Sequence, residues 1–251
     1  MLSVKPWRTD AVCFLIAVQI ACFILAGTTA ALLGKAGVAG FKDPDDFGNT
    51  LVATLGLQGA TWVLMGIFLR FHGVRFSEGF GFKKGNLFFS LSLALGVVIV
   101  ILPLALWLQE ISITLMEKIH WKLENEEAVT LLTDASSLGQ QIYLGVFAIV
   151  LAPVAEEFIF RGVLFPFFKQ LGRPEVAWIG VSLLFALIHG YVAGMIPLFV
   201  LALALTWLYE VTDNLLAPIF AHALFNAVNL ALLILMNSFP QYLPQWLNSA
   251  N

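Results

Sequence analysis

The chain has 251 residues, of which 60% are hydrophobic and only 12% charged, and its formal net charge is −3. Because about a quarter of the residues in a soluble domain are charged, this composition excludes an ordinary soluble domain and indicates a membrane protein. The sequence contains no basic tract that predicts nucleic-acid binding.

Several apolar runs reach the roughly 20 residues that a helix needs to cross a bilayer. We therefore predict an all-α, polytopic membrane helical bundle with about seven transmembrane helices. The expected spans are Ala11–Leu33, Leu51–Leu69, Leu87–Leu108, one that begins near Ile142, Val176–His189, Met195–Tyr209 and Leu215–Met236. The first run follows Lys5 and Arg8 as a signal peptide would, but its length favours a retained helix.

The distribution of polar residues predicts two regions. Residues 1–140 hold the N-terminal transmembrane helices, and residues 141–251 hold a membrane core with polar motifs and a short tail. Glu110–Gln140 is the longest polar segment, and helical spacing of its apolar residues predicts an amphipathic helix at the membrane interface. These apolar residues are Ile111, Leu115, Met116, Ile119 and Leu123. The segment is interpreted as an interfacial lid, with gating of substrate entry as the alternative.

Lysines and arginines predict the orientation, because cytoplasmic loops are enriched in them. With seven spans, a cytoplasmic N-terminus places most loop cations inside and the C-terminus outside. The cytoplasmic set is Lys5, Arg8, Arg70, Arg75, Lys83, Lys84, Lys169 and Arg173, and the opposite set is Lys35, Lys42, Lys118 and Lys122. In a bacterium the expected location is the cytoplasmic (inner) membrane.

Leu151–Phe168 places two adjacent carboxylates and an arginine in an apolar run. A charged residue at the bilayer centre costs about 3 kcal/mol on insertion scales, so such residues are candidates for function. Glu157 and Arg161 are four residues apart, share a helix face and are expected to pair. Glu156 points about 100° away from Glu157 and is available for another role.

Two further apolar spans carry polar residues at the same spacing. Phe185 and His189 are four residues apart in the fifth span, and His222 and Asn226 are four apart in the seventh. The helical rise places Glu156, His189 and His222 about 20, 21 and 14 Å from the cytoplasmic ends of their spans, so they can meet. We predict a cluster of Glu156, His189, His222 and Asn226.

This set of side chains has the groups needed for hydrolysis of an amide by water. A buried carboxylate can act as a general base, assisted by a histidine that holds the water. A second histidine and an amide can donate hydrogen bonds to a developing oxyanion. No covalent nucleophile stands out, and a GxSxG pattern is absent. Taken singly, each histidine is equally consistent with packing. For Phe185 packing is favoured over chemistry, and Asn226 is consistent with a hydrogen bond between helices.

The three patterns together resemble the motifs of the CPBP intramembrane proteases, also called the CAAX-protease and bacteriocin-processing or Abi family. Residues 156–161 fit EExxxR, residues 185–189 fit FxxxH and residues 222–226 fit HxxxN, in the order that the family has. The similarity extends over residues 142–236, and the first 140 residues carry no motif of this family.

The resemblance implies a role for each motif residue and a class of substrate. Glu156 and His189 would activate the water, His222 and Asn226 would stabilise the oxyanion, and Glu157, Arg161 and Phe185 would support the site. The implied substrate is a membrane-embedded or lipidated peptide or protein, prenylated proteins included. The sequence fixes neither the particular substrate nor the oligomeric state.

Three alternatives remain open at this stage. A zinc enzyme would use Glu156, His189 and His222 as ligands, but HExxH is absent and a mechanism without a cofactor is favoured. A non-enzymatic immunity or scaffold protein would keep the polar cluster for packing. A transporter would use Glu156 and the histidines as a proton relay, although no inverted repeat is found.

Overall fold

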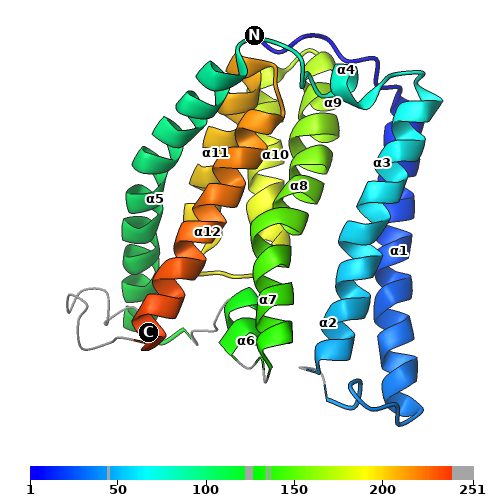
Figure 1. Cartoon of the computed structure of the whole chain (residues 1–251). Coiled ribbons are helices and arrows are strands. Elements are labelled where there is room, and N and C mark those ends of the chain that lie inside the picture. The colour runs from blue at the N-terminus through cyan, green and yellow to red at the C-terminus, as the bar shows by residue number, and fades with distance from the viewer. Residues whose placement is uncertain (44–45, 122–126, 134, 136, 239–251) are drawn as a thin grey trace.

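The computed structural model describes residues 1–251 except 44–45, 122–126, 134, 136 and 239–251. The described residues form helices and loops and contain no strand, which confirms the all-α fold class. Among the described residues, six helices are long and apolar enough to cross a membrane. The protein is therefore a multi-pass membrane protein built as a helical bundle (Figure 1).

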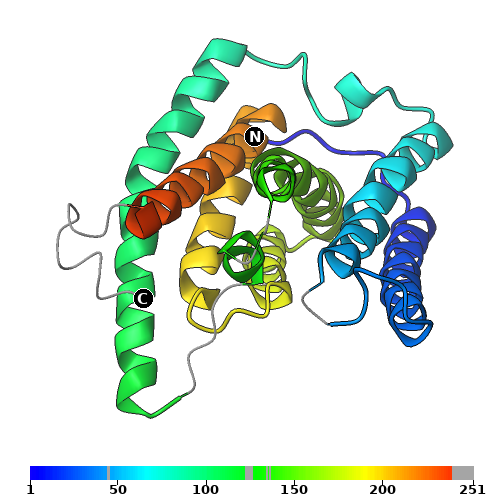
Figure 2. The same cartoon turned by 60° about the horizontal axis from the view of Figure 1, so that its bottom comes forward.

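The first two spans form a pair at one side of the molecule (Figures 1 and 2). The first span is α1 (Thr9–Lys35), and the second is the continuous helix formed by α2 (Phe47–Thr54), the π-helical segment η1 (Leu55–Gly59) and α3 (Ala60–Phe71). Gly56 lies so close to Ala26 of α1 that a side chain larger than hydrogen would not fit. This glycine lets the two helices approach each other closely.

The third span is longer than its sequence predicts. After the short helix α4 (Phe76–Gly79), α5 runs from Leu87 to Lys118 as one helix of 32 residues, about 48 Å long. Asn86 caps its start, because its side chain accepts hydrogen bonds from the N–H groups of Phe88 and Phe89. The prediction that the third span ends at Leu108 is wrong. The helix continues to Lys118 because the sequence contains no helix-breaking glycine or proline between Leu108 and Lys118.

The polar segment after Leu108 consequently begins as part of α5 and not as a separate interfacial helix. Ile111, Leu115 and Met116 lie on α5, and Leu123 lies outside the described residues. The short helix α6 (Glu127–Thr133) follows.

The fourth span, Leu138–Gln170, is a composite helix. It consists of α7 (Leu138–Val146), η2 (Phe147–Leu151), α8 (Ala152–Glu157), η3 (Phe158–Leu164) and α9 (Phe165–Gln170), where η2 and η3 are π-helical. Ser137 starts it with a capping box, in which Ser137 and Gln140 each bond the other's backbone N–H. The two glutamates of the EExxxR motif are thus the last residues of an α-helical turn between two wider turns.

Three further helices complete the bundle. They are α10 (Pro174–Ile188), α11 (Met195–Thr212) and α12 (Leu216–Ser238). α10 packs against α11, and α5 packs against both α11 and α12 although it comes from the N-terminal half of the chain (Figure 2). All seven predicted apolar runs are helical, but α10 has only 15 residues and a length of about 22 Å.

The segment before α1 crosses one end of the molecule, from the turn between α11 and α12 toward α1 (Figure 1). Lys5, which is only 4% exposed, forms an ion pair with Asp213 at 3.1 Å. Lys84 and Ser3 also donate hydrogen bonds to the Asp213 carboxylate, at 2.6 and 3.1 Å. The turn after α11 is therefore tied to both the N-terminal segment and the loop before α5.

These contacts predict an acid-sensitive component of stability. Burial acts to raise the pKa of Asp213, but the hydrogen bonds from Lys84 and Ser3 and the charge of Lys5 hold it below its usual value. A carboxyl group whose pKa is lowered by folding stabilises the protein above its unfolded pKa, about 3.9, and loses this contribution as the pH falls through its folded pKa. We expect the Tm of the wild type to fall more between pH 6 and pH 3 than that of Asp213→Asn. Thermal unfolding in detergent measures this difference, and equal falls would contradict it; replacement of the exposed Glu175 by Gln is the control.

Candidate active site

Glu157 is the centre of a buried group of charged side chains. It is fully buried, and its Oε1 atom accepts a hydrogen bond from Arg161 Nη1 at 2.7 Å. The same oxygen lies 2.9 Å from Nδ1 of His222, which comes from α12. One carboxylate thus joins a residue of its own helix to a residue of another helix. The sequence indicates the first of these contacts through the i, i+4 spacing, but it contains no signal for the second.

Arg161 lies in η3 and is also fully buried. Its Nη2 donates to the carbonyl oxygen of Ala202 at 3.0 Å, and its Nε donates to Oγ1 of Thr206 at 3.3 Å, both on α11. Its guanidinium carbon lies 4.6 Å from the centre of the Phe185 ring. These contacts compensate the cost of burying the cation. Thr206 belongs to none of the three motifs, and sequence reasoning missed it.

Glu156 is the more accessible of the two glutamates, with a side chain that is 22% exposed. Its Oε2 lies 3.8 Å from Nε2 of His222. Because a carboxylate only accepts hydrogen bonds, the contact with Glu157 places a hydrogen on Nδ1 of His222. The two contacts thus place Nδ1 of the His222 ring against Glu157 and Nε2 against Glu156.

Phe185 brings the two histidines to one place. Its fully buried ring lies 4.6 Å from the His189 ring and 5.7 Å from the His222 ring, measured between centroids. His189 is the C-cap residue that follows α10, and its Nδ1 lies 2.7 Å from the carbonyl oxygen of Phe185. Among the described residues, His189 forms no hydrogen bond with Glu156. Its Nε2 atom is the one available for another contact.

Asn226 lies one helical turn beyond His222 on α12 and is engaged with the backbone of the fourth span. Its Nδ2 donates to the carbonyl oxygen of Ala148 in η2 at 2.9 Å. A π-helical hydrogen bond to that carbonyl would come from Pro153, which has no N–H. Asn226 therefore satisfies a carbonyl that the proline leaves open, and one N–H of its amide remains for a second acceptor.

The three residues considered as zinc ligands are Glu156, His189 and His222. In the described part of the chain, no three His, Cys, Asp or Glu side chains are grouped as a metal site requires.

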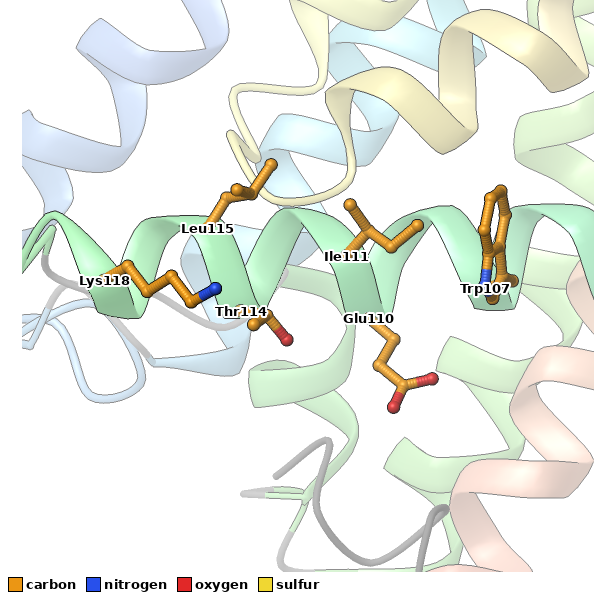
Figure 3. Close-up of a pocket in the computed structure, with 6 residues that line it drawn as sticks. All are labelled: Trp107, Glu110, Ile111, Thr114, Leu115 and Lys118. Atoms are coloured by element: carbon orange, nitrogen blue, oxygen red, sulfur yellow. The ribbon is translucent and has the colours of Figure 1, made fainter.

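A cavity of about 320 Å³ lies elsewhere, along the extended end of α5 (Figure 3). It is lined by Trp107, Glu110, Ile111, Thr114, Leu115 and Lys118. None of these residues belongs to the three motifs. The cavity is thus separate from the cluster around Glu157.

Fold and site together define a multi-pass membrane protein with a buried cluster of carboxylates, histidines and an arginine. Residues 138–228 match the family model of the type II CAAX prenyl endopeptidases, described as Rce1-like. All the motif residues lie within this range. These matches agree with the resemblance to the CPBP intramembrane proteases that the three motifs carry.

The chain is also similar to the UPF0177 protein YxdF of Lactococcus lactis subsp. lactis, with 29% identity over 108 residues. The similar region covers 43% of this chain and 57% of the relative, so the chain spans little more than half of the relative's length. No solved structure matches the chain.

Proposed function

We propose that this protein is an intramembrane endopeptidase that hydrolyses a peptide bond of a membrane-associated protein or peptide. The observation that carries the proposal is the chain of contacts from Arg161 through Glu157 to His222, with the accessible Glu156 at its end. Intramembrane groups of this kind mark functional sites, because their burial in an apolar bundle is costly. The match of residues 138–228 to a prenyl endopeptidase family supports the same activity.

Glu156 is proposed to act as the general base. It takes a proton from a water molecule, and the resulting hydroxide attacks the carbonyl carbon of the scissile bond. The 22% exposure of its side chain suits this role, since a fully buried carboxylate would not reach a water. The Nε2 atom of His189 assists by holding the water. The proton then passes to the amine that leaves when the C–N bond breaks.

His222 and Asn226 are proposed to stabilise the oxyanion of the tetrahedral intermediate. To donate from Nε2 while Nδ1–H donates to Glu157, His222 must carry a hydrogen on both ring nitrogens. Glu156 and Glu157 lie on its two sides, 3.8 Å from Nε2 and 2.9 Å from Nδ1. Asn226 donates the amide N–H that Ala148 does not occupy. Hydrogen-bond donors that the folded protein already holds in position for an oxyanion typically raise the reaction rate about a hundredfold or more.

The reaction is proposed to proceed without a metal ion, and the substrate is proposed to include lipidated peptides. We expect purified wild-type protein in detergent to cleave a farnesylated CAAX peptide or a member of a membrane-peptide library, at a rate that a zinc chelator leaves unchanged. The reason is that the candidate ligands form no metal-binding group. Comparing cleavage of the farnesylated peptide with that of the same peptide lacking the lipid determines whether the prenyl group is recognised.

Loss of cleavage with chelator and its recovery with zinc would contradict the metal-free mechanism. If folded wild-type protein cleaved neither the CAAX peptides nor any library member, the endopeptidase proposal itself would be overturned. A non-enzymatic role in the membrane would then account better for the cluster.

A further inference from the structure

In each of the π-helical segments η1, η2 and η3, one carbonyl oxygen accepts a hydrogen bond from a distant side chain. Leu57 of η1 accepts from Gln19 at 2.6 Å, and Ala148 of η2 accepts from Asn226. In η3, the carbonyl oxygen of Gly162 accepts from the indole Nε1 of Trp7 at 2.8 Å. A π-helical turn interrupts the regular backbone hydrogen bonds, and neighbouring side chains satisfy the groups that it frees.

The bond from Trp7 reaches the backbone next to the charged cluster. Gly162 directly follows Arg161, and Pro166 has no N–H with which to form an α-helical bond to Gly162. Trp7 is only 6% exposed, and its ring packs edge-on against Phe68 at 5.0 Å between centroids. The indole is therefore held on one side by packing and on the other by the η3 backbone.

The space around Gly162 leaves little freedom for η3 to move. A Cβ atom at position 162 would lie 2.7 Å from the ring of Phe80, which is itself fully buried. The carbonyl oxygen of Phe80 also accepts the N–H of Leu215, in the turn that precedes α12, at 3.0 Å. The backbone of η3 and the start of α12 are thus packed against the same residue.

The N-terminal segment makes a second connection at that turn. Lys5 pairs with Asp213, which ends α11 in the left-handed conformation with φ of 47°. Its ammonium group also lies 5.6 Å from the ring centre of Tyr209 on α11. Residues 3–7 therefore bind both the helix that carries Glu156 and Glu157 and the turn that starts the helix carrying His222.

We propose that residues 3–7 act as a positioning element for the active site, with Trp7 as its principal residue. The inference rests on the proposed endopeptidase function. Trp7 touches no reacting atom; it fixes the η3 backbone at Gly162 and so orients Arg161. Arg161 in turn holds the Glu157 oxygen to which His222 is bonded. Lys5 holds the start of α12 against the same end of the bundle.

The test uses the full chain with Trp7→Phe, which keeps an aromatic ring against Phe68, removes the N–H donor and makes the side chain smaller by one fused ring. We expect kcat to fall about fivefold to tenfold, because the loss of one buried hydrogen bond shifts the groups of the active site. KM is expected to stay within about twofold of the wild-type value. Gln19→Met is the matched control, because it also removes a side-chain donor from a π-helical carbonyl, in a span without motif residues. Its kcat is expected to stay within about twofold of the wild type.

A second readout does not depend on activity. The chain has four histidines, so the ring NMR signal of His222 can be identified by its loss in His222→Gln. We expect Trp7→Phe to shift or broaden that signal and Gln19→Met to leave it unchanged. If the wild type cleaved no substrate, the proposed function would fail, but this signal would still decide whether Trp7 positions His222.

Lys5→Met provides an independent variant should Trp7→Phe fold poorly. It keeps the aliphatic stem and removes the ion pair with Asp213, and we expect the His222 signal to shift in it as well. An unchanged His222 signal, or an unchanged kcat, in the folded Trp7 and Lys5 variants would overturn the proposal.

Discussion

Replacing Glu156 by Gln is expected to lower the rate of peptide cleavage about 1,000-fold, within the range of effects found when a general base is removed. The amide has nearly the same shape as the carboxylate but cannot accept the proton of the attacking water. Because the Glu156 side chain is partly exposed and makes only a long contact with His222 at 3.8 Å, the substitution should leave the Tm almost unchanged. The measurement is single-turnover cleavage by variant and wild type with the same substrate.

Glu175→Gln gives the matched control for this experiment. Glu175 is an exposed carboxylate in the first turn of α10. Its substitution by Gln removes only a small favourable interaction with the helix dipole. Its activity should match that of the wild type. Retention of more than about a tenth of the wild-type rate by Glu156→Gln would be incompatible with a general base at this position, since such groups contribute at least about a hundredfold.

The second large effect concerns stability. We expect Arg161→Met to destabilise the fold by about 3–5 kcal/mol, the usual cost of removing one partner of a buried ion pair. Glu157 would keep its negative charge in the bundle with only His222 as a partner. Its Oε2 atom already has no hydrogen-bond partner among the described residues. Thermal unfolding in detergent measures the loss as a fall in Tm.

A double variant separates stability from catalysis. Glu157→Leu combined with Arg161→Met removes both charges, and apolar replacement of a whole buried pair is often neutral or stabilising. Stability should therefore recover in part, while activity stays low because His222 loses the acceptor that orients its ring. Lys169→Met is the control, since the Lys169–Glu210 pair is about a quarter exposed and should contribute less than about 1 kcal/mol. A double variant no more stable than Arg161→Met would argue against this interpretation.

The features of the structure that depend on residues close together in the sequence could be predicted from it. Long apolar runs predict the helices, and the spacing of Glu157 and Arg161 predicts that they share a face. The bond between Glu157 and His222 could not be predicted, because it depends on how α12 approaches α8. Thr206 was missed for the same reason, since a threonine on an apolar helix is not distinctive.

The π-helical segments of the fourth span could not be predicted from the sequence either. Helical spacing assumes about 3.6 residues in every turn. The segments η2 and η3 contain wider turns, and these free carbonyl oxygens that accept hydrogen bonds from Asn226 and Trp7. Nothing in the local sequence shows that a tryptophan before the first span reaches Gly162, a contact between residues 155 positions apart. The composition becomes more polar after Leu108, but this change does not mark the end of α5, because the helix continues to Lys118.

The short length of α10 has a consequence for the supply of water. At about 22 Å it falls well short of the roughly 30 Å hydrocarbon layer. Local thinning of the bilayer is one way to accommodate a helix of this length, and α10 ends at Ile188, beside His189. Such thinning would bring the aqueous boundary inward next to His189, the residue proposed to hold the attacking water. An enzyme that hydrolyses bonds within a lipid layer needs one water molecule per turnover, and this dip in the bilayer would give it a short path.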